Sequence, residues 1–195
     1  VHVQSLIAAY RFLGSRWADL DPLKRTERPK IPELEPAFYD LSESDMDITF
    51  SAANTYFGAE QMTLRQIMQA LRETYCATVG AEIMHCTDPT EKRWWQERLE
   101  RVRSKPTFTA HEKKHILERL TAAEGLERYL HTKYVGQKRF SLEGGDALIP
   151  LLDDLIQQGG SCGVEEMVIG MAHRGRLNVL VNVLGKSPAV LFSEF

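Results

Sequence analysis

Apolar residues recur at helical spacing through most of the first 134 residues. The first such pattern predicts a helix over residues 2–18 and contains Val3, Leu6, Ile7, Tyr10, Leu13 and Trp17. Asp21-Pro22 ends this helix, because proline cannot continue the hydrogen-bonding pattern. Residues 19–47 contain four prolines and few apolar side chains. They predict a proline-rich linker that lies extended over a surface.

Three capping signatures follow the linker. They are Thr63 with Gln66, Asp88 with Glu91, and Thr109 with Glu112. In each pair the first side chain accepts from a backbone N–H at the helix start and the second returns the interaction, which satisfies two unpaired donors. A further amphipathic stretch predicts a helix over residues 124–133. Residues 1–134 are therefore predicted to be a mostly helical region.

The pattern changes after Gly136. Residues 138–142 and 167–171 are strand candidates, while residues 147–158 and 176–184 are helix candidates, the last closed by Gly185. Strands that alternate with helices indicate a parallel sheet with helical crossovers. The fold class predicted from the pattern is α/β, with an α/β domain that begins at residue 135 and is incomplete at residue 195.

Polar loops follow both strand candidates, at residues 143–146 (EGGD) and 173–176 (HRGR). In open parallel sheets, ligands bind beyond the carboxyl ends of strands. Arg174 and Arg176, next to backbone N–H groups at a helix start, suit a phosphate or carboxylate. His173 can exchange a proton near neutral pH. Alternatively, the two arginines pair with acids on neighbouring chains and His173 simply caps the strand.

Composition limits the possible functions. The 195 residues carry a formal net charge of −3, so no overall field favours nucleic acid or an anionic membrane. No apolar run is long enough to span a bilayer. The three cysteines form no CxxC motif and predict reduced thiols rather than disulfides. Because the sequence starts without Met and stops inside an apolar pattern, we expect a piece of a longer chain.

Three further motifs have structural explanations that we favour. His111-Glu112-Lys113-Lys114-His115 matches a zinc-protease signature, but Glu112 is needed for the cap from Thr109 and the lysines oppose a cation. Gly185-Lys186-Ser187 resembles the end of a phosphate-binding loop, yet it follows a helix instead of opening one. The pair Trp94-Trp95 lies among both cations and acids. It indicates one core and one interfacial tryptophan rather than stacking on nucleic acid.

Two long blocks carry a family resemblance. Residues 139–150, RFSLEGGDALIP, and residues 170–180, GMAHRGRLNVL, closely resemble the E1 component of the 2-oxoglutarate dehydrogenase complex. This family comprises thiamine-diphosphate-dependent 2-oxoglutarate decarboxylases. The resemblance extends through residues 120–127 to residues 9–11 and 20–23, so it covers essentially the whole chain. It implies a helical N-terminal region followed by the start of a parallel-sheet, thiamine-diphosphate-binding domain.

The resemblance also implies a function. Family members are homodimers that decarboxylate 2-oxoglutarate with thiamine diphosphate and Mg²⁺ in the tricarboxylic acid cycle. They pass the succinyl group to the E2 succinyltransferase of a multienzyme complex that also contains the E3 dihydrolipoyl dehydrogenase. By resemblance, His173 is a catalytic residue, and Arg174 and Phe140 line the cofactor pocket. A bacterial member would be cytoplasmic, and a eukaryotic one would lie in the mitochondrial matrix.

One family feature is missing from this sequence. The diphosphate and Mg²⁺ motif, which begins Gly-Asp-Gly or similar and ends in Asn, does not occur in these 195 residues. We therefore expect no metal ligand in this segment and no activity from it alone. The alternative function is an interaction module, in which the helical region docks E2 or a regulator and no residue of the segment carries chemistry.

Overall fold

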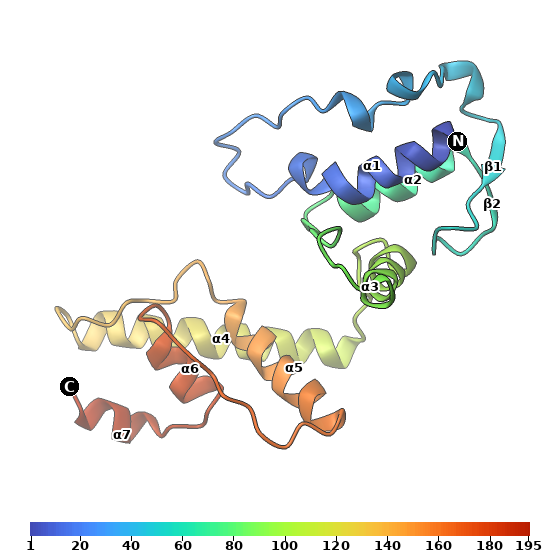
Figure 1. Ribbon diagram of the computed structural model, residues 1–195. Helices are drawn as coiled ribbons and strands as arrows, with labels where there is room; N and C mark the ends of the chain where they lie inside the picture. The colour runs from blue at the N-terminus through green and yellow to red at the C-terminus, as the bar shows by residue number, and fades with distance from the viewer. The chain divides into compact units, whose positions relative to one another are not determined.

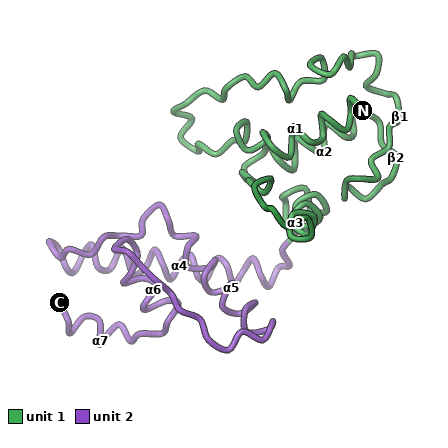
Figure 2. The backbone as a smooth tube through the Cα atoms, in the orientation of Figure 1, with its two compact units in different colours: residues 1–107 green, residues 108–195 purple.

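The chain forms two compact units. A computed structural model describes residues 1–195, of which residues 1–107 make unit 1 and residues 108–195 make unit 2 (Figure 2). The predicted division into residues 1–134 and 135–195 differs, because a long helix before residue 134 packs within unit 2. Where the catalytic domain begins stays a prediction. No helix has both the length and the apolar character needed to cross a membrane.

Unit 1 is built on two neighbouring helices. Its elements are α1 (His2–Trp17), η1 (Pro32–Leu34), η2 (Pro36–Tyr39), η3 (Glu43–Asp45), β1 (Thr49–Ser51), β2 (Gln61–Thr63), α2 (Leu64–Tyr75) and α3 (Pro89–Arg101). Helices α1 and α2 lie side by side (Figure 1). Strands β1 and β2 form a two-stranded antiparallel sheet, with Thr49 opposite Thr63.

The predicted apolar faces of α1 and α2 form the core of unit 1. Leu6, Ile7 and Leu71 are completely buried there. The prediction for the linker was wrong in part: Leu34 and Pro36 are buried as well, because short 3₁₀ turns fold this segment back onto α1. The segment after α1 therefore contributes to the core instead of only covering it.

A buried ion pair joins the three helices of unit 1. The Glu100 carboxylate of α3 is fully buried and accepts from Arg11 Nε of α1 at 2.8 Å. It also accepts from the Tyr75 hydroxyl of α2 at 2.7 Å and from the Tyr56 backbone N–H at 2.9 Å. Burial and the adjacent Glu100 charge raise the pKa of Tyr75, which keeps the phenol protonated as a donor. The charges are thus compensated inside the core.

The predicted helix starts are largely confirmed. Thr63 and Thr109 form complete capping boxes with Gln66 and Glu112. Asp88 caps α3 by accepting from the Thr90 N–H at 2.8 Å, but no reciprocal contact from a later side chain completes a box. The simpler cap suffices because a proline, which has no N–H to satisfy, opens this helix.

Unit 2 packs around one long helix. Its elements are α4 (Ala110–Lys133), α5 (Leu148–Ser161), α6 (Arg176–Asn182) and α7 (Pro188–Ser193). Helices α5 and α6 both contact α4 (Figure 1). The separate helices predicted before and after residue 124 were wrong, since α4 runs uninterrupted through Gly125. A glycine inside a helix costs only about 1 kcal/mol relative to alanine, which the flanking helical turns outweigh.

The two predicted strands of unit 2 do not form. Residues 138–142 and 167–171 have no strand pairing, and Val168 is 97% exposed. A strand is stabilised by a neighbour that pairs with its backbone groups, and no other segment of this chain supplies one. The helical character predicted for the N-terminal region is confirmed. The predicted parallel sheet is not in this chain.

Candidate functional site

An aromatic ring and an imidazole face each other in unit 2. Phe140 and His173 stack with ring centroids 4.9 Å apart and planes inclined by 29°. Phe140 keeps 57% of its surface exposed, and His173 is exposed as well. These are two of the three site residues that the sequence predicted, and they lie 33 positions apart in the chain. The pair presents a flat, partly apolar surface beside a titratable nitrogen.

Gly175, which stands between the two arginines, holds the Phe140–His173 stack in place. The Gly175 N–H donates to the Phe140 carbonyl at 2.9 Å, which ties the two segments together. Gly175 has φ +74°, and a Cβ on it would lie 2.5 Å from Leu142 Cδ1. Only glycine combines this backbone conformation with so close an approach. The backbone of residue 175 thus positions Phe140 and His173 relative to each other.

Arg174, the third predicted site residue, reaches the other polar loop. Its guanidinium donates to the Glu143 carbonyl, so the loops at residues 173–176 and 143–146 lie together. Neither Arg174 nor Arg176 forms an ion pair with an acid of this chain. Both positive charges are exposed and can attract an anion.

Two of the backbone donors predicted at the start of α6 are already used. The Gly175 N–H bonds to the Phe140 carbonyl, and the Arg176 N–H bonds to the His173 carbonyl at 3.3 Å. These two N–H groups are therefore not free for a phosphate, because the tight turn that brings His173 over Phe140 uses them.

A buried carboxylate, which the sequence reasoning missed, organises the site. Glu127 of α4 is 3% exposed and accepts from Arg139 Nη1 at 2.5 Å. It also accepts from the Leu142 N–H at 3.1 Å and from Asn178 Nδ2 of α6 at 3.1 Å. One side chain therefore holds the residues before and after Phe140 as well as the helix that follows His173.

Asn178 completes this polar core. It is fully buried, and Nδ2 also donates to the Ala123 carbonyl of α4 at 2.9 Å. Its Oδ1 accepts from Asn182 Nδ2 at 2.6 Å. A usable signal existed in the sequence: Glu127 stands on the same helix face as Ala123 and Leu130, where an apolar residue is expected. A carboxylate at a core position needs a cationic partner, and Arg139 is a nearby candidate.

The donor set of this chain does not fit a metal-bound diphosphate. Mg²⁺ is held by oxygen ligands such as carboxylates. No three His, Cys, Asp or Glu side chains lie close enough together to hold a metal ion. In the loop at residues 173–176 the side-chain groups are an imidazole and two guanidiniums, and the guanidiniums repel a cation. Arg174 and Arg176 therefore suit an organic anion, and no cluster of ligands for the metal lies beside them.

The other motifs have structural roles in the chain. Glu112 is engaged in the Thr109 capping box, and His115 pairs with Asp153 of α5 at 2.6 Å. The Lys186 ammonium binds Glu194 at 2.7 Å. The expectation of one buried tryptophan was wrong, since Trp94 is 48% and Trp95 40% exposed. The buried face of α3 is formed instead by Gln96 and Glu100.

The fold and the site define a mostly α-helical protein segment in which an aromatic–imidazole pair lies beside two exposed arginines that form no ion pair. No protein-family model matches it. Over all 195 residues it is 69% identical to a 2-oxoglutarate dehydrogenase E1 component from Cupriavidus necator and 52% identical to one from Azotobacter vinelandii. A third, from Haemophilus influenzae, is 47% identical over 197 aligned positions.

The whole chain takes part in each of these three alignments, but it spans only about a fifth of the relatives' own length, 20% for the first and 21% for the other two. At such identities the similarity reflects common ancestry and a shared fold. The chain is therefore a homologue of one segment of the 2-oxoglutarate dehydrogenase E1 component.

Proposed function

We propose that the full-length protein is the decarboxylating E1 component of a 2-oxoglutarate dehydrogenase complex. It uses thiamine diphosphate and Mg²⁺, and it transfers the succinyl group to the lipoyl group of E2. The observation that carries this proposal is the 69% identity to a protein of that name across every residue of the chain. The alignment covers all 195 residues, so it spans the two polar loops as well as the helices.

The chemistry of the loops supports the same proposal. The substrate 2-oxoglutarate carries two carboxylates, and Arg174 and Arg176 are exposed cations without an acidic partner. His173 lies against Phe140, where its imidazole can hydrogen-bond the distal carboxylate or move a proton at the reacting carbon. Phe140 and Arg174 line the pocket for the cofactor and substrate.

The cofactor's diphosphate and metal belong elsewhere in this proposal. Because the chain has no group of side chains that fits Mg²⁺, residues outside these 195 must hold them. The segment alone is then inactive, and its contribution to the reaction is the wall formed by Phe140, His173 and Arg174. The proposed assembly is a homodimer that binds E2 and E3, and the bacterial relatives favour the bacterial cytoplasm.

A second candidate function applies to unit 1. Its own hydrophobic core and the buried Arg11–Glu100 pair are features of a module that folds as a unit. Such a module would dock E2 or a regulator and take no part in the chemistry. Binding of purified E2 by unit 1 alone, residues 1–107, would support docking. Both functions can be true of one protein.

The activity is tested by supplying thiamine diphosphate, Mg²⁺ and 2-oxoglutarate to the full-length gene product. Release of CO₂ from 2-oxoglutarate is the expected result. Pyruvate, which lacks the distal carboxylate, serves as the control and should react far more slowly. If the folded protein releases no CO₂ from 2-oxoglutarate, the proposal is refuted.

A further inference from the structure

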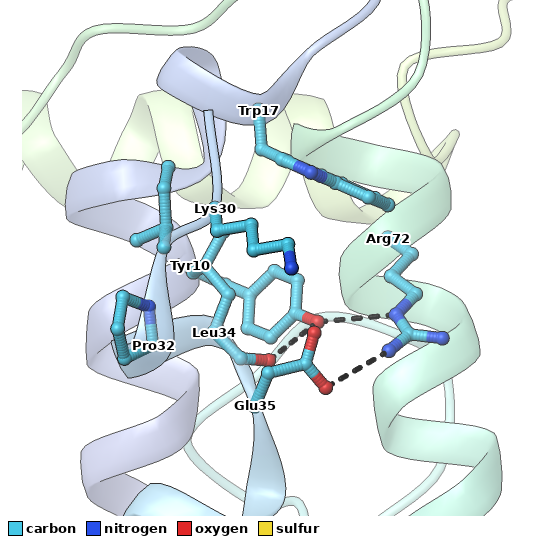
Figure 3. A pocket seen from close by; sticks show the side chains of 8 residues that line it. Tyr10, Trp17, Lys30, Pro32, Leu34, Glu35 and Arg72 are labelled. Atoms are coloured by element: carbon cyan, nitrogen blue, oxygen red, sulfur yellow. Dashed lines mark hydrogen bonds and ion pairs between the residues drawn. The ribbon is translucent and has the colours of Figure 1, made fainter. Parts of the chain in front are cut away.

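Unit 1 contains a cavity that the proposed activity does not use. It lies between α1, α2 and the segment around η1, with a volume of about 340 Å³ (Figure 3). Cavities of roughly 300 to 1,000 Å³ are typical of small-molecule sites. Among the residues that line it are Tyr10, Trp17, Lys30, Leu34, Glu35 and Arg72. None of them belongs to the loops of unit 2.

The inner wall of this cavity is apolar and fixed. Tyr10 is 1% exposed, and its hydroxyl donates to the Leu34 carbonyl at 3.0 Å while accepting from Arg72 Nε at 3.2 Å. Burial raises the pKa of Tyr10, so the phenol stays neutral. Trp17 forms the opposite part of the wall, and the Arg28 guanidinium lies 4.4 Å from its ring centroid. The cation–π contact holds the indole in place.

Two cations reach the cavity from different elements. Arg72 extends from α2 and Lys30 from the segment before η1, and Figure 3 shows both side chains directed toward the space between them. The Lys30 ammonium takes part in no ion pair. Arg72 meets Glu35 at 3.9 Å, which is an ion-pair contact beyond hydrogen-bonding distance. The outer nitrogens of Arg72 therefore have no hydrogen-bonded acid.

We propose that this cavity binds a small organic carboxylate with a flat apolar body. The body packs against Trp17 and Tyr10, and the carboxylate takes the two outer N–H groups of Arg72, with the Lys30 ammonium beside it. The lining residues carry two positive charges and one negative charge, so an anion is preferred over a cation. A bidentate carboxylate suits the planar guanidinium better than the distant Glu35 does.

A substitution of Glu35 should change the affinity for an anion and for a cation in opposite directions. Its carboxylate lies beside Arg72 and partly offsets the positive charge that would attract the ligand. Removing that negative charge should strengthen anion binding, whereas a site built for a cationic ligand would lose its anchor. The Glu35→Gln variant therefore separates the two kinds of ligand.

The probe is 4-fluorophenylacetate, followed by ¹⁹F NMR with the full-length gene product. Wild-type protein should bind it, and the neutral 4-fluorophenylacetamide should bind at least about tenfold more weakly, because a charge-assisted hydrogen bond contributes about 1.5–3 kcal/mol. Arg72→Gln should weaken binding by about tenfold or more, and Lys30→Gln by a smaller factor. Arg16→Gln, an exposed arginine of α1 outside the cavity, should leave the affinity unchanged. Glu35→Gln should tighten binding.

Several results would overturn the proposal. They are no binding by the wild type, equal affinity for the acid and the amide, or an Arg72→Gln variant that binds like the wild type. Preferential binding of 4-fluorophenethylamine that is lost in Glu35→Gln would assign the cavity to a cation. Because Arg72 also contacts Tyr10, tryptophan fluorescence checks the fold of its variant. The exposed Lys30 provides a second variant with little risk to folding.

Discussion

The Glu127 carboxylate holds the Arg139 guanidinium at 2.5 Å, one residue before the phenylalanine that stacks on His173. The two side chains keep only 4% and 12% of their surface exposed. A buried pair of this kind contributes little net stability compared with an apolar pair, but its loss leaves a charge without compensation. In this chain the pair fixes where the Phe140 segment crosses α4.

Glu127→Gln should destabilise unit 2 by about 3–5 kcal/mol, because it leaves the largely buried Arg139 charge unpaired. Denaturant unfolding of the chain, followed by far-UV circular dichroism, measures the change. Glu124→Gln is the matched control on the same helix. Glu124 is 65% exposed and pairs only with exposed Arg128, so its loss should cost no more than about 0.5 kcal/mol.

The double variant Glu127→Gln with Arg139→Met should recover part of that loss, since it removes both charges together. If the two substitutions were simply additive, the carboxylate and the guanidinium would not be coupled. The role assigned to Glu127 would then be wrong.

Gly175→Ala should disrupt the site through both conformation and contact. The residue has φ +74°, and its new Cβ would lie 2.5 Å from Leu142 Cδ1. The conformational cost is about 1–2 kcal/mol, and the forced contact adds about 1–3 kcal/mol. Gly163→Ala is the matched control, since Gly163 has φ +87° with open space around it and should show only the conformational cost. Equal unfolding free energies for the two variants would show that Leu142 does not constrain residue 175.

The helices could be predicted from the sequence because their signals are local. Thr63 and Thr109 lie three residues before their capping partners, and the apolar face of α1 repeats every turn. The sequence also placed a polar loop after each strand candidate, but the parallel sheet that would bring such loops together is absent. The structure brings the loops together through Glu127 and Gly175 instead.

What could not be predicted depends on distant partners. Residues 167–171 are apolar enough for a strand, but a strand also needs a neighbouring backbone, and periodicity cannot show whether one exists. The cavity in unit 1 likewise requires Lys30 and Arg72, which are 42 positions apart, to approach the same space. Neither residue belongs to a motif that would mark it.

The contribution of the buried Cys76 thiol to the stability of unit 1 should be lost as the pH rises from about 9 to about 11. Burial raises the pKa of its thiol from 9.0 to about 11. In this window the unfolded chain loses the thiol proton while the native chain retains it, so the free energy of unfolding falls with increasing pH. The loss is at most about 2–3 kcal/mol, from about 1.4 kcal/mol per pKa unit. Below pH 9 this contribution is fully present.

Denaturant unfolding at pH 8, 9, 10 and 11 measures this effect by tryptophan fluorescence, since all three tryptophans lie in unit 1. Cys76→Ala should reduce the pH dependence, leaving the part due to the buried Tyr10 and Tyr75 phenols, whose pKa is also raised. Cys162→Ala, which removes an exposed thiol of unit 2, should leave the pH dependence as in the wild type. An unchanged slope in Cys76→Ala would mean that this thiol titrates alike in both states.

The most direct test of the proposed active-site role compares two histidines of unit 2 in the full-length protein. The measurement is steady-state CO₂ release from 2-oxoglutarate with thiamine diphosphate and Mg²⁺. His173→Ala should lower kcat/KM by about 100-fold or more, as expected for loss of a group that binds substrate or transfers a proton. His111→Ala, at an exposed position in the first turn of α4, should retain wild-type activity. Wild-type turnover in His173→Ala, or equal losses in both variants, would contradict the role of His173.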